Sequence, residues 1–440
     1  MGYKFLDKYH DEVFRCIKCG ACRAVCPTFL EELEESMVTR GRMSLIEAVI
    51  DRRLDLTEIF KNRISTCITC GSCIPACPSS VKIDDIILAA RAEIAELNGI
   101  DFFIRFISGK IVKSGWALPH FMRFLGIIER SVYVPLSTLN VFKGFLPYTI
   151  EGRTRTFPAI KGKSLRERYY KLSNRSTAAL QHCRTTEPQH RKSVAFFAGC
   201  SINFVYQDIG MSVINVLKRL GFNVILPKGD LCCGAPIRAI GDHKTVLTLA
   251  ESNFEILRKL EVEAILTACP TCGLTLKKKY PELLPDAEGM EAFVCKIKDI
   301  NEFIVEKDIF PSLVTGHPSL NTRITYHDPC HLNWGLGISR QPREILRGIW
   351  GVNFIEMRNA EGCCGFGGIF SFNHYDLSMR IAERKLKSIN DTLAEVVVTS
   401  CPGCRMHIED ALRQAGLRTG VKHIMQMVDK AIHTLDSKPR

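Results

Sequence analysis

Almost every cysteine of this chain belongs to one of four regularly spaced sets. Of the 20 cysteines among 440 residues, only Cys183 and Cys295 stand apart. The first kind of set has the spacing C-x-x-C-x-x-C-x-x-x-C-P and occurs as Cys16, Cys19, Cys22, Cys26 and as Cys67, Cys70, Cys73, Cys77. The second kind joins a lone cysteine, a Cys-Cys-Gly and a Cys-Pro-x-Cys; it occurs as Cys200, Cys232, Cys233, Cys269, Cys272 and as Cys330, Cys363, Cys364, Cys401, Cys404. Thiols spaced in this way are metal ligands or disulfide partners.

The first kind of set has the pattern of a two-cluster bacterial ferredoxin. Three close cysteines bind one [4Fe–4S] cubane, and the fourth ligates the other cluster of the pair. The predicted ligands are therefore Cys16, Cys19, Cys22 and Cys77 for one cubane and Cys67, Cys70, Cys73 and Cys26 for the other. Two zinc sites are the alternative, but zinc ligands come in pairs rather than in a run of three plus one. A c-type haem is excluded because no C-x-x-C is followed by His.

The second kind of set does not suit a single metal ion. Five cysteines are one too many for tetrahedral zinc. Two adjacent cysteines also chelate one metal poorly, because the trans peptide between them splays their thiols. They are better suited to two different irons of a multinuclear cluster.

The elements that carry these cysteines differ between the two parts of the chain. Residues 1–100 are predicted to be mainly helical outside the cysteine loops, as in EELEESMVTRGRMSLIEAVIDRR and VKIDDIILAARAEIAELNG. From about residue 192, strand and helix patterns alternate. The stretches MSVINVLKRLGF, FEILRKL, REILRGIW and LSMRIAERKLKSI are predicted helices.

The C-terminal part is an internal duplication. Equivalent cysteines are separated by 130 residues for the lone cysteine, 131 for the Cys-Cys pair and 132 for the Cys-Pro-x-Cys. The flanks also match, SVAFFAGC with RITYHDPC and EAILTACPTC with EVVVTSCPGC, each a short strand that ends near cysteine. Alternating strands and helices predict parallel sheets with functional groups beyond the carboxyl ends of the strands. The three cysteine loops of each copy should therefore converge.

A basic segment separates the two parts. The net charge is +12, and residues 101–180 hold 14 Lys or Arg against 4 Asp or Glu. No nucleic-acid recognition motif accompanies this charge, which disfavours a nucleic-acid partner. Two interpretations stay open: docking on an anionic membrane face or a partner subunit, or a linker with solvated charges. We see no secretory signal and no window long enough to span a membrane.

The predicted fold class is a multidomain chain: a mainly α-helical, ferredoxin-like two-cluster domain followed by duplicated α/β domains with parallel sheets. The predicted segments are 1–100 for the two-cluster domain, 101–191 for the basic connector, and 192–315 and 316–440 for the two repeats. Because no export signal is seen, we expect a reducing compartment, where metal binding is favoured over disulfides.

The spacing of the second kind of set resembles the cysteine-rich CCG domain of the heterodisulfide reductase family. The whole chain is similar to its fused form, shared by iron–sulfur subunits of glycolate oxidase, lactate-utilisation and glycerol-3-phosphate dehydrogenase systems. The stretch GCCGFGGIFSF is similar to the lactate-utilisation members as well. The resemblance implies one or two noncubane [4Fe–4S] clusters, one held by Cys200, Cys232, Cys233, Cys269 and Cys272 and the other by Cys330, Cys363, Cys364, Cys401 and Cys404. A single cluster, with the other set structural, is the alternative.

Smaller signals accompany the sets. YHDPCHL puts His327, Asp328 and His331 around Cys330. His331 is a candidate proton donor to a departing thiolate, with hydrogen bonding to a cluster sulfur or the backbone as the alternative. Cys183 and Cys295 are interpreted as ordinary thiols. GCCGFGG lacks the lysine and hydroxyl of a phosphate-binding loop.

Three classes of function follow from these features. The favoured one is an iron–sulfur electron-transfer subunit of a membrane-associated oxidoreductase complex at the cytoplasmic face, linked to a flavoprotein dehydrogenase, a cytochrome b-type subunit or quinone. The second is a catalytic subunit that reduces a disulfide at the two CCG sites. A zinc-binding module is disfavoured by the cluster motifs. No flavin or nicotinamide fingerprint is visible, so neither cofactor is expected on this chain.

Overall fold

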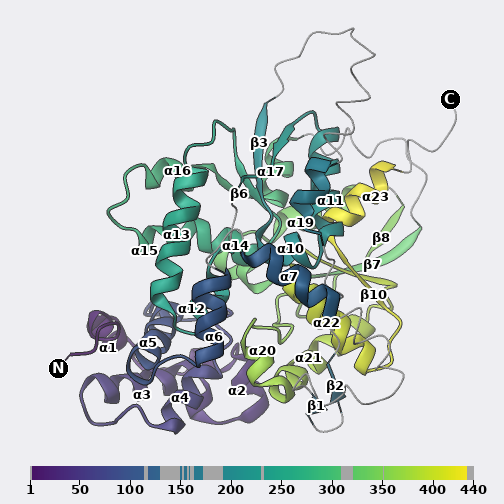
Figure 1. Ribbon diagram of the computed structural model, residues 1–440. Helices are drawn as coiled ribbons and strands as arrows, with labels where there is room; N and C mark the ends of the chain where they lie inside the picture. The colour runs from purple at the N-terminus through teal and green to yellow at the C-terminus, as the bar shows by residue number, and fades with distance from the viewer. Residues whose placement is uncertain are drawn as a thin grey trace, which may run out of the picture.

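The computed structural model describes residues 2–112, 117–128, 149–150, 153–155, 158, 163–171, 192–228, 232–308, 321–349 and 351–433. Figure 1 shows the N-terminal helices gathered at one corner of the molecule, beneath the helices of the first repeat and beside α20 (Phe370–Asn373) and α21 (Tyr375–Asn390) of the second. The two repeats each carry a parallel sheet. The predicted fold class is confirmed: a helical N-terminal part is followed by two α/β repeats.

The N-terminal part is helical, and its elements are η1 (Asp7–Tyr9), α1 (His10–Phe14), η2 (Ala21–Arg23), α2 (Pro27–Glu32), η3 (Glu35–Met37), α3 (Thr39–Ile50), α4 (Glu58–Ser65) and α5 (Ile83–Asn98). Thr57 caps α4 by accepting a hydrogen bond from the Phe60 backbone N–H at 3.2 Å. Asp84 and Asp85 lie in the first turn of α5, where carboxylates are favourable. Apolar residues of α3, α4 and α5 form one buried core.

One stretch of the mainly helical region consists of several helical elements. EELEESMVTRGRMSLIEAVIDRR forms the end of α2, then η3, then α3. The break is at Leu33, which ends α2 in the left-handed conformation at φ 57°. The bend lets the Thr28 hydroxyl donate to the Met37 carbonyl oxygen at 2.9 Å. Tertiary contacts thus override the local helix preference here.

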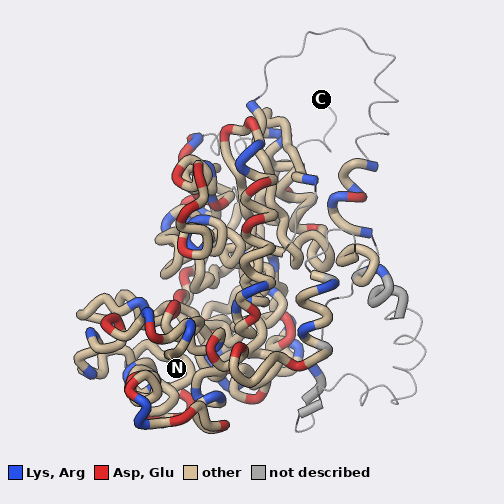
Figure 2. The backbone as a smooth tube through the Cα atoms, turned by 60° about the vertical axis from the view of Figure 1, so that its left-hand side comes forward, with Lys and Arg blue, Asp and Glu red and all other residues tan. Residues whose placement is uncertain are grey.

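The connector is described only in part. Its described elements are α6 (Phe102–Phe106), the π-helix η4 (Ile107–Val112), α7 (Ala117–Ile128) and the short antiparallel strands β1 (Thr149–Ile150) and β2 (Arg153–Thr154). Much of the predicted basic, amphipathic segment lies outside the described residues. Among those described, no helix combines the length and the apolar character needed to cross a membrane. Figure 2 shows Lys and Arg interspersed with Asp and Glu along the described backbone.

Each repeat is built on a four-stranded parallel sheet. The first contains β3 (Ser193–Phe197), β4 (Asn223–Ile225), β5 (Ile265–Thr267) and β6 (Ile297–Asp299), in the order β4-β3-β5-β6. The second contains β7 (Thr322–His327), β8 (Val352–Phe354), β9 (Val396–Thr399) and β10 (Gly420–His423), in the order β10-β9-β7-β8. Read from its other end, the second order is β8-β7-β9-β10, which corresponds strand for strand to β4-β3-β5-β6. The duplication seen in the sequence is therefore also a duplication of topology.

Helices complete the two repeats. The first repeat carries α10 (Gly199–Phe204), α11 (Gln207–Arg219), α12 (Ala235–Ala239), α13 (His243–Leu257), α14 (Pro270–Leu274), η7 (Thr275–Lys279), α15 (Tyr280–Leu283), α16 (Met290–Lys296) and α17 (Ile300–Glu306). The second carries η8 (His331–Gly335), α19 (Arg340–Gly348), α20 (Phe370–Asn373), α21 (Tyr375–Asn390), α22 (Pro402–Gln414) and α23 (Ile424–His433). Helix α11 of the first repeat packs on α23 of the second, and α17 packs on α19. Because α11 is equivalent to α19 and α17 to α23, the same pair of helices meets twice where the two repeats contact each other. One apolar core continues through both repeats.

The N-terminal part docks on both repeats. Lys279 of the first repeat lies 2.6 Å from Asp85 of α5, and Ser65 of α4 lies 2.9 Å from the His374 ring of the second. Close backbone approach needs glycine at one point: Gly241 has φ 86°, and an added Cβ would lie 2.3 Å from the Arg91 carbonyl oxygen. The boundaries of the four segments stay predictions, but the parts are tightly joined.

Candidate metal centres

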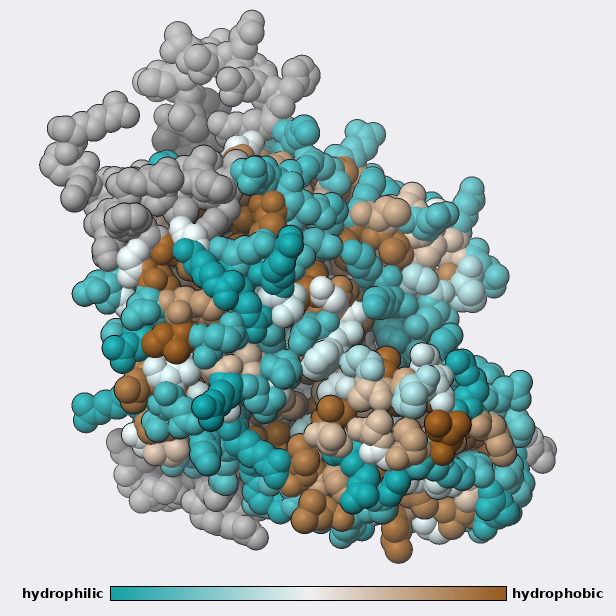
Figure 3. All heavy atoms as spheres, turned by 180° about the vertical axis from the view of Figure 1, so that it is seen from behind, coloured by the Kyte–Doolittle hydropathy of each residue, from teal (hydrophilic) through white to brown (hydrophobic). Residues whose placement is uncertain are grey.

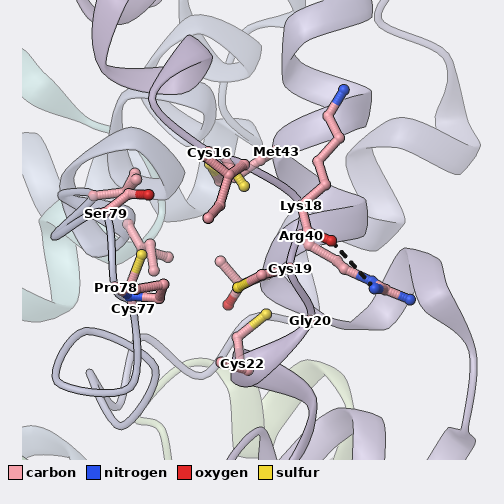
Figure 4. Close-up of a pocket in the computed structure, with 15 residues that line it drawn as sticks. Cys16, Lys18, Cys19, Gly20, Cys22, Arg40, Met43, Cys77, Pro78 and Ser79 are labelled. Atoms are coloured by element: carbon pink, nitrogen blue, oxygen red, sulfur yellow. Dashed lines mark hydrogen bonds between the residues drawn. The ribbon is translucent and has the colours of Figure 1, made fainter.

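Four cysteines from both ferredoxin-type runs surround one hollow near the N-terminus. The hollow is partly open to solvent, and its space including that open part is about 370 Å³; its cysteines are Cys16, Cys19, Cys22 and Cys77. Figure 4 shows Cys77 arriving from a separate segment of chain to face the other three. Arg40 donates to the Lys18 carbonyl oxygen at 3.3 Å and so ties α3 to the loop between Cys16 and Cys19.

A second hollow has the complementary composition. It is also partly open to solvent, with about 390 Å³ of space including that open part, and its cysteines are Cys67, Cys70, Cys73 and Cys26. The two hollows are thus nearly equal in size, and each takes three cysteines from one run and the last from the other. This arrangement, with thiols as the donors, fits a pair of [4Fe–4S] clusters with exchanged ligands. Burial raises the pKa of Cys70 to about 11, so a bound cation is needed to keep its thiolate at neutral pH.

Two buried guanidinium groups stand beside the second hollow. Arg42, which is 1% exposed, donates to the Arg63 carbonyl oxygen at 2.8 Å and to the Thr66 hydroxyl at 3.1 Å. Arg91 donates to the carbonyl oxygens of Ile64 and Ser65, each at 3.2 Å, and to that of Cys67. Sequence reasoning missed both arginines. For Arg91, the available signal was its position within the apolar run ILAARAEIA. Their positive charges favour an anionic group in the hollow.

The first CCG set assembles beyond the carboxyl ends of parallel strands, as predicted. Cys200 follows β3, the Cys232–Cys233 pair follows β4 and precedes α12, and Cys269 follows β5. The thiols contact one another: hydrogen bonding from Cys232 holds the pKa of Cys233 well below its usual value, while contact with Cys200 and Cys233 raises that of Cys232. Thiols that share protons in this way are placed to bind one polynuclear group.

Glycine at position 199 leaves room for a cluster ligand. Gly199 has φ 63°, and a Cβ there would lie 2.7 Å from the Cys272 sulfur. Gly199→Ala is therefore expected to displace Cys272 and to lower the iron content of the first CCG site. Gly221→Ala is the matched control, because Gly221 has φ 85° but nothing within 4 Å of its added Cβ. Both changes carry a strain of about 1–2 kcal/mol, and only the first should reduce iron; equal iron in both would contradict this prediction.

The second CCG set assembles in the same way. Cys330 follows β7, the Cys363–Cys364 pair follows β8, and Cys401 and Cys404 lie at the start of α22. Contact with Cys363 lowers the pKa of Cys364, as contact with Cys232 does for Cys233 in the first repeat. The two sets therefore share this contact within the adjacent pair of cysteines.

The cysteine sets adjoin one another in a fixed order. Cys70 of the second hollow belongs to an apolar cluster against which Cys330 and Cys363 of the second CCG set pack. The second and first CCG sets then meet where the Cys269 thiol contacts Cys401, and this contact lowers the pKa of Cys401. From the first hollow to the first CCG set, the order is first hollow, second hollow, second CCG set, first CCG set.

His331 lies where three of these loops meet. Its Nε2 is 3.2 Å from the Thr69 carbonyl oxygen, and its Nδ1 is 2.9 Å from the Thr271 hydroxyl. Since a carbonyl oxygen only accepts, Nε2–H donates to Thr69 and a neutral ring accepts from Thr271. These contacts favour a role in positioning the loops, and proton transfer by His331 stays a prediction. Of the two remaining cysteines, Cys295 is exposed on α16 and Cys183 lies outside the described residues.

Two known domain families match the chain. The model of the 4Fe-4S dicluster domain matches residues 12–81, and that of the cysteine-rich CCG domain matches residues 194–277 and again residues 324–409. These matches coincide with the two kinds of cysteine set. The cofactors are accordingly several 4Fe-4S clusters, as the spacing predicted.

Several curated proteins are similar to this chain over nearly its whole length. The chain is 31% identical over 427 residues to an uncharacterized iron-sulfur protein of Methanococcus maripaludis, covering 95% of this chain and 72% of that protein. It is 28% identical to a probable glycolate oxidase iron-sulfur subunit of Bacillus subtilis, covering 94% and 92%. It is 24% identical to a subunit of the dihydromethanophenazine:CoB–CoM heterodisulfide reductase of Methanosarcina acetivorans, covering 96% and 94%.

Proposed function

The chain belongs to the family of iron–sulfur proteins that join a 4Fe-4S dicluster domain to two CCG domains, and on this basis we propose that it is the electron-transfer subunit of an oxidoreductase complex. Relatives of nearly equal length are described as a probable glycolate oxidase iron-sulfur subunit and as a subunit of a heterodisulfide reductase. In the proposal, Cys16, Cys19, Cys22 and Cys77 hold one cubane; Cys67, Cys70, Cys73 and Cys26 hold the other; and each CCG set holds a noncubane cluster. These clusters supply one-electron transfer.

The observation that carries the proposal is the contact between successive cysteine sets. Cys70 packs near Cys330 and Cys363, and Cys269 contacts Cys401. The proposed cluster ligands are therefore arranged so that each set of cysteines adjoins the next. Buried Arg42 and Arg91 stabilise negative charge at the second hollow, which is the junction between the N-terminal part and the repeats.

The first hollow is the proposed point of contact with the redox partner. Cys19 is exposed there, and the side chain of the adjacent loop residue Ile17 is 67% exposed. In the CCG sets, by contrast, each cysteine is either buried or partly buried. Apolar side chains also reach the surface elsewhere, as Figure 3 shows on the face seen from behind. A flavoprotein dehydrogenase or a cytochrome b-type subunit is the proposed partner, and purification of the native complex without oxygen identifies which one accompanies the chain.

Membrane association is proposed through the connector. On α6, Phe102 is 84% exposed and Phe106 is 49% exposed, with the cation Arg105 between them. Exposed aromatic side chains beside a cation suit the surface of an anionic membrane. The proposed site of this contact is the cytoplasmic face of the membrane, with quinone as a candidate acceptor.

The exchanged ligands give a direct test of the proposal. Anaerobically purified protein is expected to hold about 16 irons in four tetranuclear clusters. Cys77→Ser should disturb the cubane signal that Cys19→Ser also disturbs, although Cys77 belongs to the other run. Cys26→Ser should likewise disturb the same cubane signal as Cys70→Ser, although Cys26 belongs to the first run. An iron content near 8, or pairing of Cys77→Ser with Cys70→Ser in paramagnetic spectra, would overturn the assignment.

Reduction of a disulfide is a second candidate function. It is favoured by the contact between Cys269 and Cys401, which brings the two CCG sets together. Two adjacent clusters suit cleavage of a disulfide, because the bond takes two electrons and each cluster delivers one at a time. Turnover of a disulfide with release of two thiols, measured with a reduced one-electron donor dye, would favour this function over a relay.

A further inference from the structure

The second repeat places a buried imidazole beside its cysteines at the end of β7. The donor atoms of His327, Cys364 and Cys404 all lie within 4.8 Å of one another, and all three residues are buried. His327 is 1% exposed, and within the described residues neither of its ring nitrogens has a hydrogen-bond partner. A polar ring buried without a partner is destabilising. The position of His327 therefore points to a group that occupies the space between these three residues.

Other polar groups around the second set already have partners. Asp328 pairs with Arg343 at 2.8 Å, His407 lies 3.0 Å from the Ser378 hydroxyl, and the Lys385 ammonium donates to the Ala360 carbonyl oxygen at 3.1 Å. These interactions account for one atom or more of each side chain. His327 differs in that neither ring nitrogen has such a hydrogen-bond partner, and a ring nitrogen lies within 4.8 Å of the Cys364 and Cys404 sulfurs.

The first repeat has a hydrocarbon ring at the equivalent position. His327 pairs with Thr399, two residues before Cys401, and Phe197 pairs with Thr267, two residues before Cys269. The site of an added Gly199 Cβ lies 3.7 Å from the Phe197 ring and 2.7 Å from the Cys272 sulfur, so this ring lies beside the counterpart of Cys404. The two sites thus share their thiols but differ in this one ring.

We propose that His327 is a nitrogen ligand of the iron–sulfur cluster held by the second CCG set. The inference rests on the proposed function, in which that set holds a cluster. One neutral ring nitrogen forms an Fe–N bond and the other keeps its proton, so no electron changes hands on binding. Imidazole is an ordinary ligand of iron. His327 is an additional ligand beside the five cysteines of the set, and because neutral imidazole carries no charge it adds none to the site.

The test uses holoprotein purified without oxygen and labelled with ¹⁵N-histidine. Electron–nuclear double resonance on the paramagnetic state of the second site should show a strongly coupled histidine nitrogen. His327→Phe, which installs the residue of the first repeat, should abolish this coupling while most of the iron stays. His407→Gln is the matched control, since His407 is also buried in this repeat but lies outside the three-residue group; its spectrum should keep the coupling.

The outcomes separate this inference from the proposed function. If Cys364→Ala leaves the iron content unchanged, the second set holds no cluster and the cofactor assignment fails. If Cys364→Ala removes iron but the unmodified protein shows no strongly coupled histidine nitrogen, ligation by His327 alone is overturned. Because the unmodified protein decides this point, the test holds even if His327→Phe does not fold. Zinc in place of iron at this site would also overturn the inference.

Discussion

Replacement of Lys279 by Met should destabilise the joint between the N-terminal part and the first repeat by about 3 kcal/mol. The Lys279 ammonium lies 2.6 Å from Asp85, 3.1 Å from Asp84 and 3.2 Å from Glu282. The Lys279 and Asp85 side chains are only 11% and 7% exposed. Removal of one partner of a buried ion pair costs about 3–5 kcal/mol, because the other charge is left unpaired. We expect the lower end of that range, since Arg238 remains 3.4 Å from Asp85.

The charge state of Lys279 supports this expectation at neutral pH. Burial alone lowers its pKa, but Asp84, Asp85 and Glu282 raise it by more, so the pKa lies above its usual value. A raised lysine pKa stabilises the folded state fully below the unfolded pKa near 10.4. The contribution is lost only as the pH rises through the still higher folded pKa. The effect of Lys279→Met should therefore be constant between pH 7 and about pH 9.

Urea unfolding without oxygen, followed by cluster absorbance and by circular dichroism, measures this difference. Lys259→Met is the control, because the Lys259 side chain is 69% exposed in its pair with Glu255 and exposed pairs contribute about 0–1 kcal/mol. The double variant Lys279→Met, Asp85→Leu should recover part of the lost stability, since it removes the unpaired carboxylate. Equal effects of Lys279→Met and Lys259→Met would show that the buried network does not hold the joint.

What the sequence could reveal about this protein was local. The ferredoxin-type cysteines lie within the short segments 16–26 and 67–77, and the offsets of 130 to 132 residues between the two CCG sets make the duplication visible. The predicted helices MSVINVLKRLGF and LSMRIAERKLKSI correspond to α11 and α21, because each has an apolar face at helical spacing. The convergence of the cysteine loops followed from the parallel sheets.

What the sequence could not reveal depends on distant partners. Asp85 and Lys279 are 194 residues apart, and nothing in either local pattern names the other. Arg42 and Arg91 likewise depend on backbone carbonyl groups near the end of α4, which is a separate helix. The contrast between Phe197 and His327 was visible in the aligned strands SVAFFAGC and RITYHDPC. Its meaning required the structure, because the pattern of a buried strand is satisfied by either ring.

The second large effect is expected from the buried ammonium of Lys385 beside the second CCG set. Lys385 is 2% exposed, and burial lowers its pKa to about 8, so it is mostly charged at pH 7. The equivalent residue of the first repeat, 132 positions earlier, is Asn253, which donates to the Cys232 carbonyl oxygen at 3.1 Å. A buried cation stabilises the more negative, reduced state of a neighbouring group. The repeats therefore differ in charge as well as in the ring at the end of their first strand.

Lys385→Asn should make the potential of the second site more negative by on the order of 50–100 mV. This shift corresponds to about 1–2 kcal/mol of interaction between charges at an effective dielectric constant near 20. An anaerobic redox titration followed by electron paramagnetic resonance measures it, with the signal of the first CCG site as an internal reference. Lys387→Asn is the matched control, because Lys387 is exposed on the same helix and its charge is screened by solvent. Above about pH 8 Lys385 loses its proton, so the difference between the unmodified protein and Lys385→Asn should shrink. Equal potentials of these two proteins at pH 7 would show that the ammonium does not influence the second site.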